Sequence, residues 1–179
     1  EQLIVLLHGV GASGADMAPL AQALRIEFPQ AALLAPDAPH PFDAGGPGHP
    51  GRQWFSIQGI TEENRQARID AALPPLHAWL RQTQERLRLP PATTALAGFS
   101  QGAIMALEST QQDVHLAGRV VALSGRFAQL PQAPHAHTTL HFVHGKADKV
   151  KVYDGEHEAI VDETLWNSVQ AQLKEKAPP

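Results

Sequence analysis

The segment Gly-Phe-Ser-Gln-Gly, residues 98–102, has the residue types and spacing of a nucleophilic turn. It lies between the apolar run 94–99 and the apolar segment 103–110, which is the strand–turn–helix setting that the G-x-S-x-G motif requires. Glycines flank the serine in such a turn because the helix packs close to the strand and leaves no room for a Cβ. The motif predicts Ser100 as the nucleophile of an acyl-transfer reaction, at the carboxyl edge of a sheet.

A serine hydroxyl becomes a strong nucleophile only when a histidine takes its proton and a carboxylate orients that histidine. In the chain order that goes with this motif, the acid follows the serine and the histidine comes last. Four aspartates follow the serine: Asp113, Asp148, Asp154 and Asp162. Asp148 alone comes directly after an apolar core run, at 139–144, and His157 is the only histidine after it. We therefore expect a triad of Ser100, Asp148 and His157.

A glycine-rich loop near the start of the chain fits two kinds of anion site. Residues 3–16, LIVLLHGVGASGAD, lead from an apolar run through Gly9, Gly11 and Gly14 into a helix, and Asp37 follows the next apolar run. This is the setting of a dinucleotide-binding loop, in which backbone N–H groups hold a pyrophosphate at a helix N-terminus. The same N–H groups can stabilise an oxyanion that exists only in a transition state.

The serine motif favours the second of these sites. An acyl-transfer serine needs two N–H donors, one from the residue after the nucleophile and one from the loop after an earlier strand. In this chain those donors are the N–H groups of Gln101 and Val10. His8, directly before the loop, is expected to be a local hydrogen-bonding residue at a strand end, and no histidine spacing indicates a metal site.

The elements that must position these residues alternate along the chain. Five short apolar runs are typical of strands buried on both faces of a parallel sheet: residues 3–7, 31–35, 94–99, 119–124 and 139–144. Between the first two runs, Met17, Leu20 and Leu24 fall on one helical face. The alternation predicts one α/β domain over residues 1–179, with a mostly parallel central sheet and helices on both faces.

A long helix is expected over residues 62–89, with Thr61 as its N-cap and acidic residues in its first turn. Pro74 and Pro75 should break or kink that helix. Before it, residues 36–60 form a Pro/Gly-rich segment that contains Trp54 and Phe55. Such a long connection is often a binding loop beside an active site, and the alternative is a surface loop held by its two aromatic residues.

Composition excludes several other classes of protein. The chain is 43% hydrophobic and 18% charged, and its formal charge of −4 leaves no large basic surface for nucleic acid. It has no cysteine, and no apolar run approaches the length of a membrane span. Residues 1–20 do not read as a signal peptide. We therefore expect a cytoplasmic location and no stable membrane insertion. Because the sequence begins at Glu1 and not at a methionine, we also expect a trimmed or processed chain.

Four segments together resemble the phospholipase/carboxylesterase family of α/β-hydrolases, which includes small serine esterases similar to acyl-protein thioesterases: LLHGVGASG, GRQWFSIQGI, GFSQGAIMALES and HGKAD. The resemblance extends over nearly the whole chain. It implies the α/β-hydrolase fold, a triad at Ser100, Asp148 and His157, hydrolysis of carboxylic esters or thioesters, and no cofactor. It also implies that Trp54 and Phe55 lie beside the substrate cleft.

One spacing departs from the family. His157 follows Asp148 by only nine positions, whereas family members carry a helix and more between these residues. Two parallel strands also need a crossover of about a dozen residues, and the stretch between the run 139–144 and the run 150–153 is shorter than that. Either the strand-like run 150–153 is not a parallel strand, or a segment near residues 149–150 is missing; we favour the missing segment.

Three functions therefore compete. The first is a serine esterase acting on a small acyl ester, thioester or lysophospholipid. The second is a non-catalytic α/β-hydrolase relative that binds ligands, which the short spacing of Asp148 and His157 permits. The third is a nucleotide-dependent oxidoreductase built on the loop of Gly9, Gly11 and Gly14. The sequence does not indicate the oligomeric state or the acyl-chain length.

Overall fold

A central parallel sheet organises the structure, a computed structural model that describes residues 1–112, 116–131 and 137–143. Its five strands lie in the order β2-β1-β5-β6-β7, and every pair is parallel. They are β1 (Leu3–Leu7), β2 (Ala32–Leu34), β5 (Thr94–Phe99), β6 (Arg119–Leu123) and β7 (Thr139–Val143). Each lies within an apolar run from which a strand is predicted, so the predicted parallel α/β fold is confirmed.

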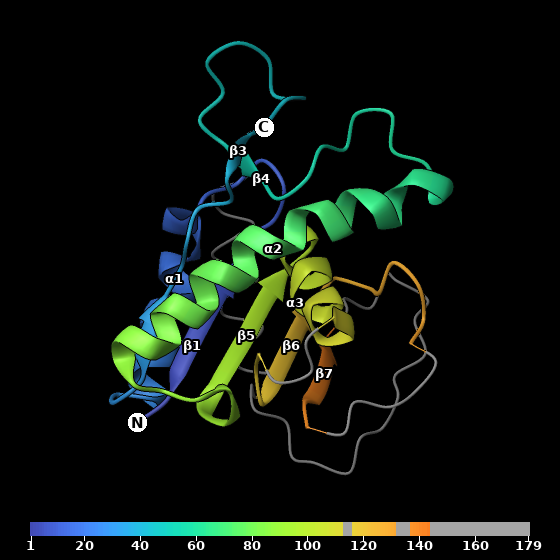
Figure 1. The fold of residues 1–179 in the computed structure, drawn as a ribbon. Coiled ribbons are helices and arrows are strands. Elements are labelled where there is room, and N and C mark those ends of the chain that lie inside the picture. Colours follow the sequence, from blue (N-terminus) through green and yellow to red (C-terminus); the bar gives the residue numbers. More distant parts are fainter. Residues whose placement is uncertain (113–115, 132–136, 144–179) are drawn as a thin grey trace.

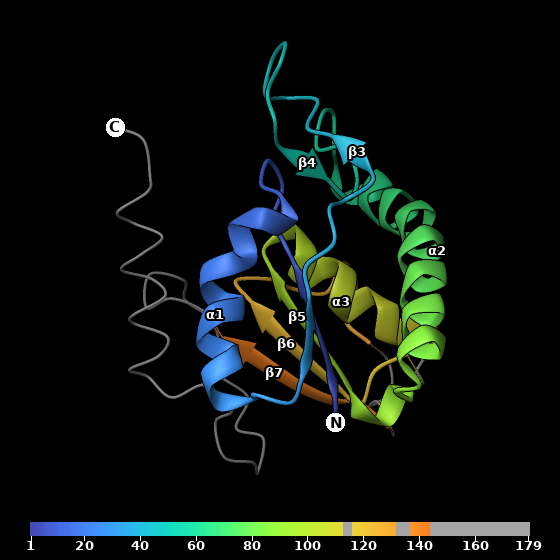
Figure 2. The same cartoon turned by 90° about the vertical axis from the view of Figure 1, so that its left-hand side faces the viewer.

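Helices cover both faces of this sheet, as Figure 2 shows. One face carries α1 (Ala18–Glu27), which continues from the 3-10 helix η1 (Gly14–Met17). The other face carries α2 (Glu62–Leu87) and α3 (Gln101–Gln112), while the short 3-10 helix η2 (Pro91–Thr93) leads into β5. Within the described ranges, no helix is both long enough and apolar enough to span a membrane.

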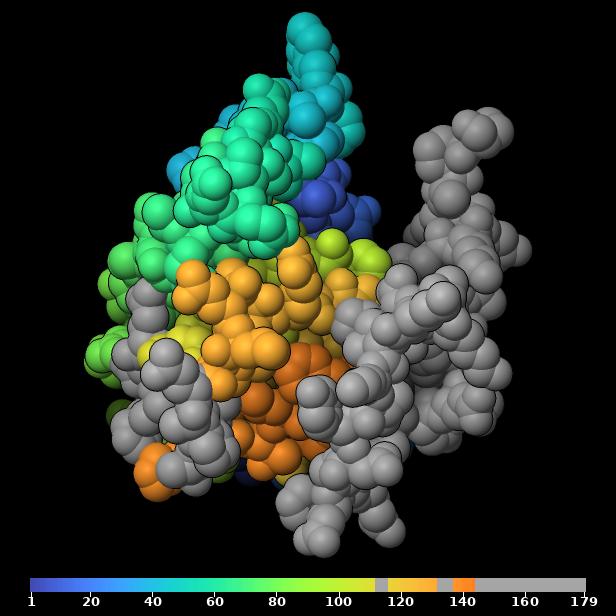
Figure 3. All heavy atoms as spheres, turned by 90° about the vertical axis from the view of Figure 1, so that its right-hand side faces the viewer, coloured from blue at the N-terminus to red at the C-terminus, as the bar shows by residue number. Residues whose placement is uncertain are grey.

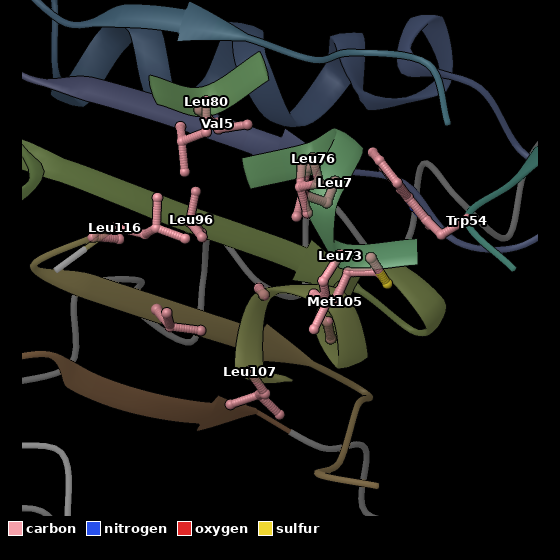
Figure 4. Close-up of a cluster of buried hydrophobic side chains, with 14 of the residues drawn as sticks. Val5, Leu7, Trp54, Leu73, Leu76, Leu80, Leu96, Met105, Leu107 and Leu116 are labelled. Carbon is pink, nitrogen blue, oxygen red and sulfur yellow. The ribbon is translucent and has the colours of Figure 1, made fainter. Parts of the chain in front are cut away.

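The side chains of β1 alternate between the two layers of the core, because successive residues of a strand point to opposite faces. Leu3, Val5 and Leu7 pack into the larger cluster under α2 and α3. Ile4 and Leu6 pack with the residues of α1. Figure 4 shows the larger cluster, with Trp54 at one end of it. A strand buried on both faces explains why its sequence is an unbroken apolar run.

The first turn of α2 forms as predicted. Thr61 is the N-cap, and its Oγ1 accepts a hydrogen bond from the Asn64 N–H while the Asn64 Oδ1 accepts one from the Thr61 N–H. Of the predicted break or kink at Pro74 and Pro75, the break is wrong, because α2 continues through both residues. Each proline removes one intrahelical hydrogen bond, but both lie on the exposed side of the helix where water can bind the freed carbonyls. Buried leucines on both sides of the pair hold α2 to one core.

Residues 36–60 contain a small antiparallel pair, β3 (His40–Pro41) and β4 (Arg52–Gln53). This hairpin rises beyond the carboxyl ends of the parallel strands in Figure 2, and its cyan residues stand out at the top of the molecule in Figure 3. The long connection is therefore next to the sheet edge where the serine motif ends.

The connections reverse direction between β1 and β5. The chain passes from β1 to β2 on one side, and then crosses by α2 to β5 on the other side of β1. Because α1 and α2 lie on opposite faces, the carboxyl ends of β1 and β5 form the kind of switch point at which open α/β sheets bind ligands. The glycine loop follows β1 and Ser100 follows β5, so the topology brings the two motifs together.

Candidate active site

Ser100 is held in a left-handed backbone conformation at the end of β5. Its φ is +51°, a region that costs a non-glycine residue free energy and that is found at functional turns. Its N–H donates to the Leu123 carbonyl of β6 over 2.9 Å, and its carbonyl accepts from the N–H groups of Ala103 and Ile104 in α3. The strained turn is thus supported from both sides, and it leaves the serine side chain half-buried at the carboxyl edge.

Both glycines of the motif are required by packing, as the sequence predicts. A Cβ on Gly98 would lie 2.3 Å from the Gly102 carbonyl oxygen, and a Cβ on Gly102 would lie 2.1 Å from the Leu7 carbonyl oxygen. Real Cβ atoms are not found this close to backbone oxygen. The absence of side chains at these positions lets α3 start directly against the end of β1.

The glycine loop lies against the serine turn. β1 pairs with β5 so that Leu7 is opposite Gly98, and a Cβ on Gly9 would be 3.5 Å from the Ser100 Cβ. The loop then makes a tight turn in which the Ala12 N–H donates to the Gly9 carbonyl over 3.2 Å. Gly11, the third residue of this turn, has φ +79°, which is typical of a type II turn.

Two backbone N–H groups near Ser100 have no acceptor within the described part of the chain. The Val10 N–H, at the second position of the turn, donates to no described residue. Gln101 is the first residue of α3, and the first N–H groups of a helix have no partner inside it. These are the two N–H groups that the sequence predicts as oxyanion donors.

Three further amides of the loop donate to groups of the protein itself, which argues against a dinucleotide. The Gly14 N–H donates to the Asp37 carboxylate over 2.7 Å, and the Ser13 N–H donates to the Asp16 carboxylate over 2.8 Å. The Gly11 N–H donates to the Arg52 carbonyl over 2.8 Å. Asp37, which a dinucleotide-binding loop would use for a ribose, instead accepts from the Gly14 N–H. These bonds leave few free amides for a pyrophosphate and make the oxidoreductase the weakest of the three interpretations.

Comparison with known proteins agrees with this geometry. The family model for phospholipases and carboxylesterases matches residues 1–177. The chain belongs to the phospholipase/carboxylesterase family. It is similar to the esterase YpfH of Escherichia coli, at 44% identity over 150 residues that cover 84% of this chain and 63% of that protein. Acyl-protein thioesterase 1 of Kluyveromyces lactis is 32% identical over 133 residues, which cover 70% of this chain and 57% of the thioesterase.

Solved structures show the same fold. The crystal structure of esterase PE8 superposes with a TM-score of 0.66 at 27% identity, covering 98% of this chain and 93% of that one. A carboxylesterase from Mesorhizobium loti has a TM-score of 0.68 at 18% identity, covering 97% and 74% of the two chains. The α/β-hydrolase fold expected from the family is therefore confirmed. The chain spans less than two thirds of the length of the curated relatives that it matches.

Trp54 and Phe55 are buried against the sheet edge, with 3% and 6% of their surfaces exposed. The Trp54 indole N–H donates to the His8 carbonyl over 2.9 Å, which holds residues 36–60 to the end of β1. Both aromatic residues border a pocket of about 740 Å³ between the hairpin and α2. The buried pair thus fixes this segment to the end of β1, and its contact with substrate stays a prediction.

His8 is a buried structural residue whose tautomer is determined by its partners. Its Nε2 accepts from the Ala38 N–H over 2.9 Å, so the ring proton is on Nδ1, which donates to the Gly9 carbonyl over 2.7 Å. Burial lowers the pKa of His8 and outweighs the hydrogen bond to the Gly9 carbonyl and the charges of Asp37 and Asp16, which act in the opposite direction. The neutral imidazole is the form that holds the start of the glycine loop.

We expect this arrangement to make the fold less stable in acid. An unfolded histidine has a pKa of about 6.5, and the folded pKa of His8 is lower, so below about pH 6.5 the unfolded chain binds the proton more readily. The contribution of neutral His8 to the free energy of unfolding is therefore fully present above that pH. It is lost as the pH decreases toward the folded pKa of His8. Melting temperatures between pH 8 and pH 5 would measure the decrease.

His8→Gln is the matched variant for this measurement, because glutamine can accept from the Ala38 N–H but does not titrate. Burial also lowers the pKa of His77, so part of the acid sensitivity remains in the variant. We expect His8→Gln to have a shallower decrease in melting temperature than the unmodified protein. Identical pH profiles would contradict the assignment of His8.

Asp148 and His157, the expected partners of Ser100, lie outside the described residues. The same is true of the segment near residues 149–150, so the short spacing between the two residues stays as the sequence gives it. Within the described ranges, no three His, Asp or Glu side chains group as metal ligands. The side-chain hydrogen bonds of Gln101 and the hydrogen bonds of Arg52 could not be predicted from the sequence. Their partners lie up to 47 positions away, and no local pattern marks them.

Proposed function

We propose that this protein is a serine esterase that hydrolyses carboxylic esters through an acyl-enzyme intermediate. The observation that carries this function is Ser100 in a strained turn, beside a loop whose Val10 N–H has no described acceptor. Family membership supports the same chemistry, because a named esterase is 44% identical to the chain. The triad would be Ser100, Asp148 and His157.

In this mechanism the Ser100 Oγ attacks the ester carbonyl carbon while His157 takes the hydroxyl proton and Asp148 orients the imidazole. The carbonyl oxygen becomes an oxyanion, which accepts hydrogen bonds from the N–H groups of Val10 and Gln101. The tetrahedral intermediate then collapses, and the alcohol leaves with the proton from His157. In the second half of the reaction, His157 takes a proton from water as the water attacks the acyl carbon. The bond to the Ser100 Oγ then breaks, Ser100 regains its proton from His157, and the acid is released.

The substrate is proposed to be a small acyl ester, and thioesters or lysophospholipids are further candidates in the same reaction class. The similarity to an acyl-protein thioesterase is the basis for the thioester. We place Trp54 and Phe55 at the border of the substrate site, because the Trp54 N–H and the Phe55 carbonyl bind the side chain of Gln101, the residue after Ser100. No cofactor takes part in this mechanism.

The test is pre-steady-state hydrolysis of p-nitrophenyl acetate by the full chain. An acyl-enzyme that forms faster than it decays gives a burst of p-nitrophenol, with an amplitude approaching one equivalent of protein. We expect this burst, followed by steady turnover. If the protein releases p-nitrophenol no faster than buffer without protein, it is instead the non-catalytic relative.

A further inference from the structure

Arg52 binds the glycine loop on one side of the proposed oxyanion site. Its N–H donates to the Ala12 carbonyl and its carbonyl accepts from the Gly11 N–H, each over 2.8 Å, as in a β-bridge. Its guanidinium donates to the carbonyls of Ala38 and Pro39, over 2.9 and 2.7 Å. The turn that contains Val10 is therefore fastened to the start of the segment 52–55.

Gln101 binds the other end of the same segment through its side chain. Its Oε1 accepts from the Trp54 N–H and its Nε2 donates to the Phe55 carbonyl, each over 2.8 Å. The side chain is 3% exposed, so these bonds are shielded from water and are costly to break. The residue whose N–H is a proposed oxyanion donor is thus fixed to the segment 52–55 as well.

Trp54 closes the network between these two attachments. Its indole N–H donates to the His8 carbonyl, and the Trp54 and His8 rings lie 5.5 Å apart. Four residues, 52–55, therefore contact the loop after β1 and the first residue of α3. The backbone of this segment, with hydrogen bonds at both ends, therefore links the loop that carries the Val10 N–H to the residue that carries the other proposed donor.

We propose that residues 52–55 are a clasp that sets the separation and direction of the Val10 and Gln101 N–H groups, with the Gln101 side chain and Arg52 as positioning residues. This inference rests on the proposed esterase function. Donors for an oxyanion must be placed before the reaction, because a displacement of about 1 Å can cost about 100-fold in rate. The β-sheet alone holds β1 and β5 together, whereas the clasp holds the two turns that extend beyond their ends.

Gln101→Met tests the clasp, because methionine has a similar length, cannot make either hydrogen bond and keeps the backbone N–H. Gln84→Met is the matched control: Gln84 is also a buried glutamine, and its Nε2 donates to Thr94 Oγ1 and the Leu116 carbonyl, near the amino end of β5. Each variant loses two buried hydrogen bonds. We would measure the melting temperature, kcat and KM for p-nitrophenyl acetate, and the rate constant of inactivation by a fluorophosphonate.

We expect both variants to lower the melting temperature, and Gln101→Met alone to lower kcat and the inactivation rate constant, each by about tenfold or more with little change in KM. If Gln101→Met is recovered unfolded, Arg52→Met takes its place, since it loses the guanidinium bonds to Ala38 and Pro39 and keeps the backbone bonds to the glycine loop. Unchanged kcat and inactivation in the folded variant, or an equal loss in Gln84→Met, would overturn the clasp.

The proposed function is tested separately in the same experiment. Inactivation of the unmodified protein by the fluorophosphonate supports an activated serine whatever the variants do. If the unmodified protein is inactivated and Gln101→Met matches it, the esterase function holds and the clasp alone is wrong. If the unmodified protein is neither active nor inactivated, the proposed function is wrong and the clasp with it.

Discussion

Ser100→Ala is expected to reduce hydrolysis of p-nitrophenyl acetate by about 10⁴-fold or more, because no other described group is placed to form the acyl-enzyme. Alanine keeps the Cβ, so the strained φ of +51° and the hydrogen bonds of the Ser100 backbone remain. We therefore expect the unfolding free energy to change by less than about 0.5 kcal/mol, as for a substitution that leaves packing intact. Steady-state kinetics and urea unfolding would measure the two quantities.

Ser109→Ala is the control on the same helix. The Ser109 hydroxyl donates to the Met105 carbonyl over 2.7 Å and lies 3.0 Å from the His77 Nε2, away from the serine turn. This variant loses buried hydrogen bonds but should keep its turnover. Turnover by Ser100→Ala at a substantial fraction of the unmodified rate would refute Ser100 as the nucleophile.

Val10→Pro is expected to lower kcat by about 10²–10³-fold, the cost of removing one oxyanion donor. Proline deletes the N–H and suits the position, because Val10 is the second residue of the turn closed by the Gly9 carbonyl and the Ala12 N–H. Gly11 has φ +79° at the third position, and type II turns favour proline before such a residue. The fold should therefore tolerate the change.

Val10→Ala is the paired control, since it removes the side chain and keeps the N–H. We expect Val10→Ala to retain kcat within a few-fold, and both variants to have a melting temperature close to that of the unmodified protein. Equal kcat values for the proline and alanine variants would exclude the Val10 N–H as an oxyanion donor.

The fold was predictable from sequence where the signal is local and periodic. Buried strands such as β1 and β5 are unbroken apolar runs, and Thr61 has the side chain that an N-cap needs. The continuation of α2 through Pro74 and Pro75 was not predictable in this way. The cost of a proline is local, whereas the burial that outweighs it comes from contacts with distant elements.

The same distinction applies to the site. The serine turn, its two glycines and the neighbouring loop were visible because the motif specifies a local geometry. Asp37 shows the limit of a pattern, because it matches a dinucleotide site in sequence and yet binds the Gly14 N–H. The Gln101 side chain finds its partners in Trp54 and Phe55, and such long-range pairing has no period that a sequence could reveal.

The most direct test of the central claim is covalent labelling of the full chain with a fluorophosphonate, followed by peptide mass mapping. The probe phosphonylates a serine that has been activated by a base. We expect one adduct per chain, on Ser100 in the turn between β5 and α3. An intact chain without an adduct, or an adduct on any other residue, would contradict it.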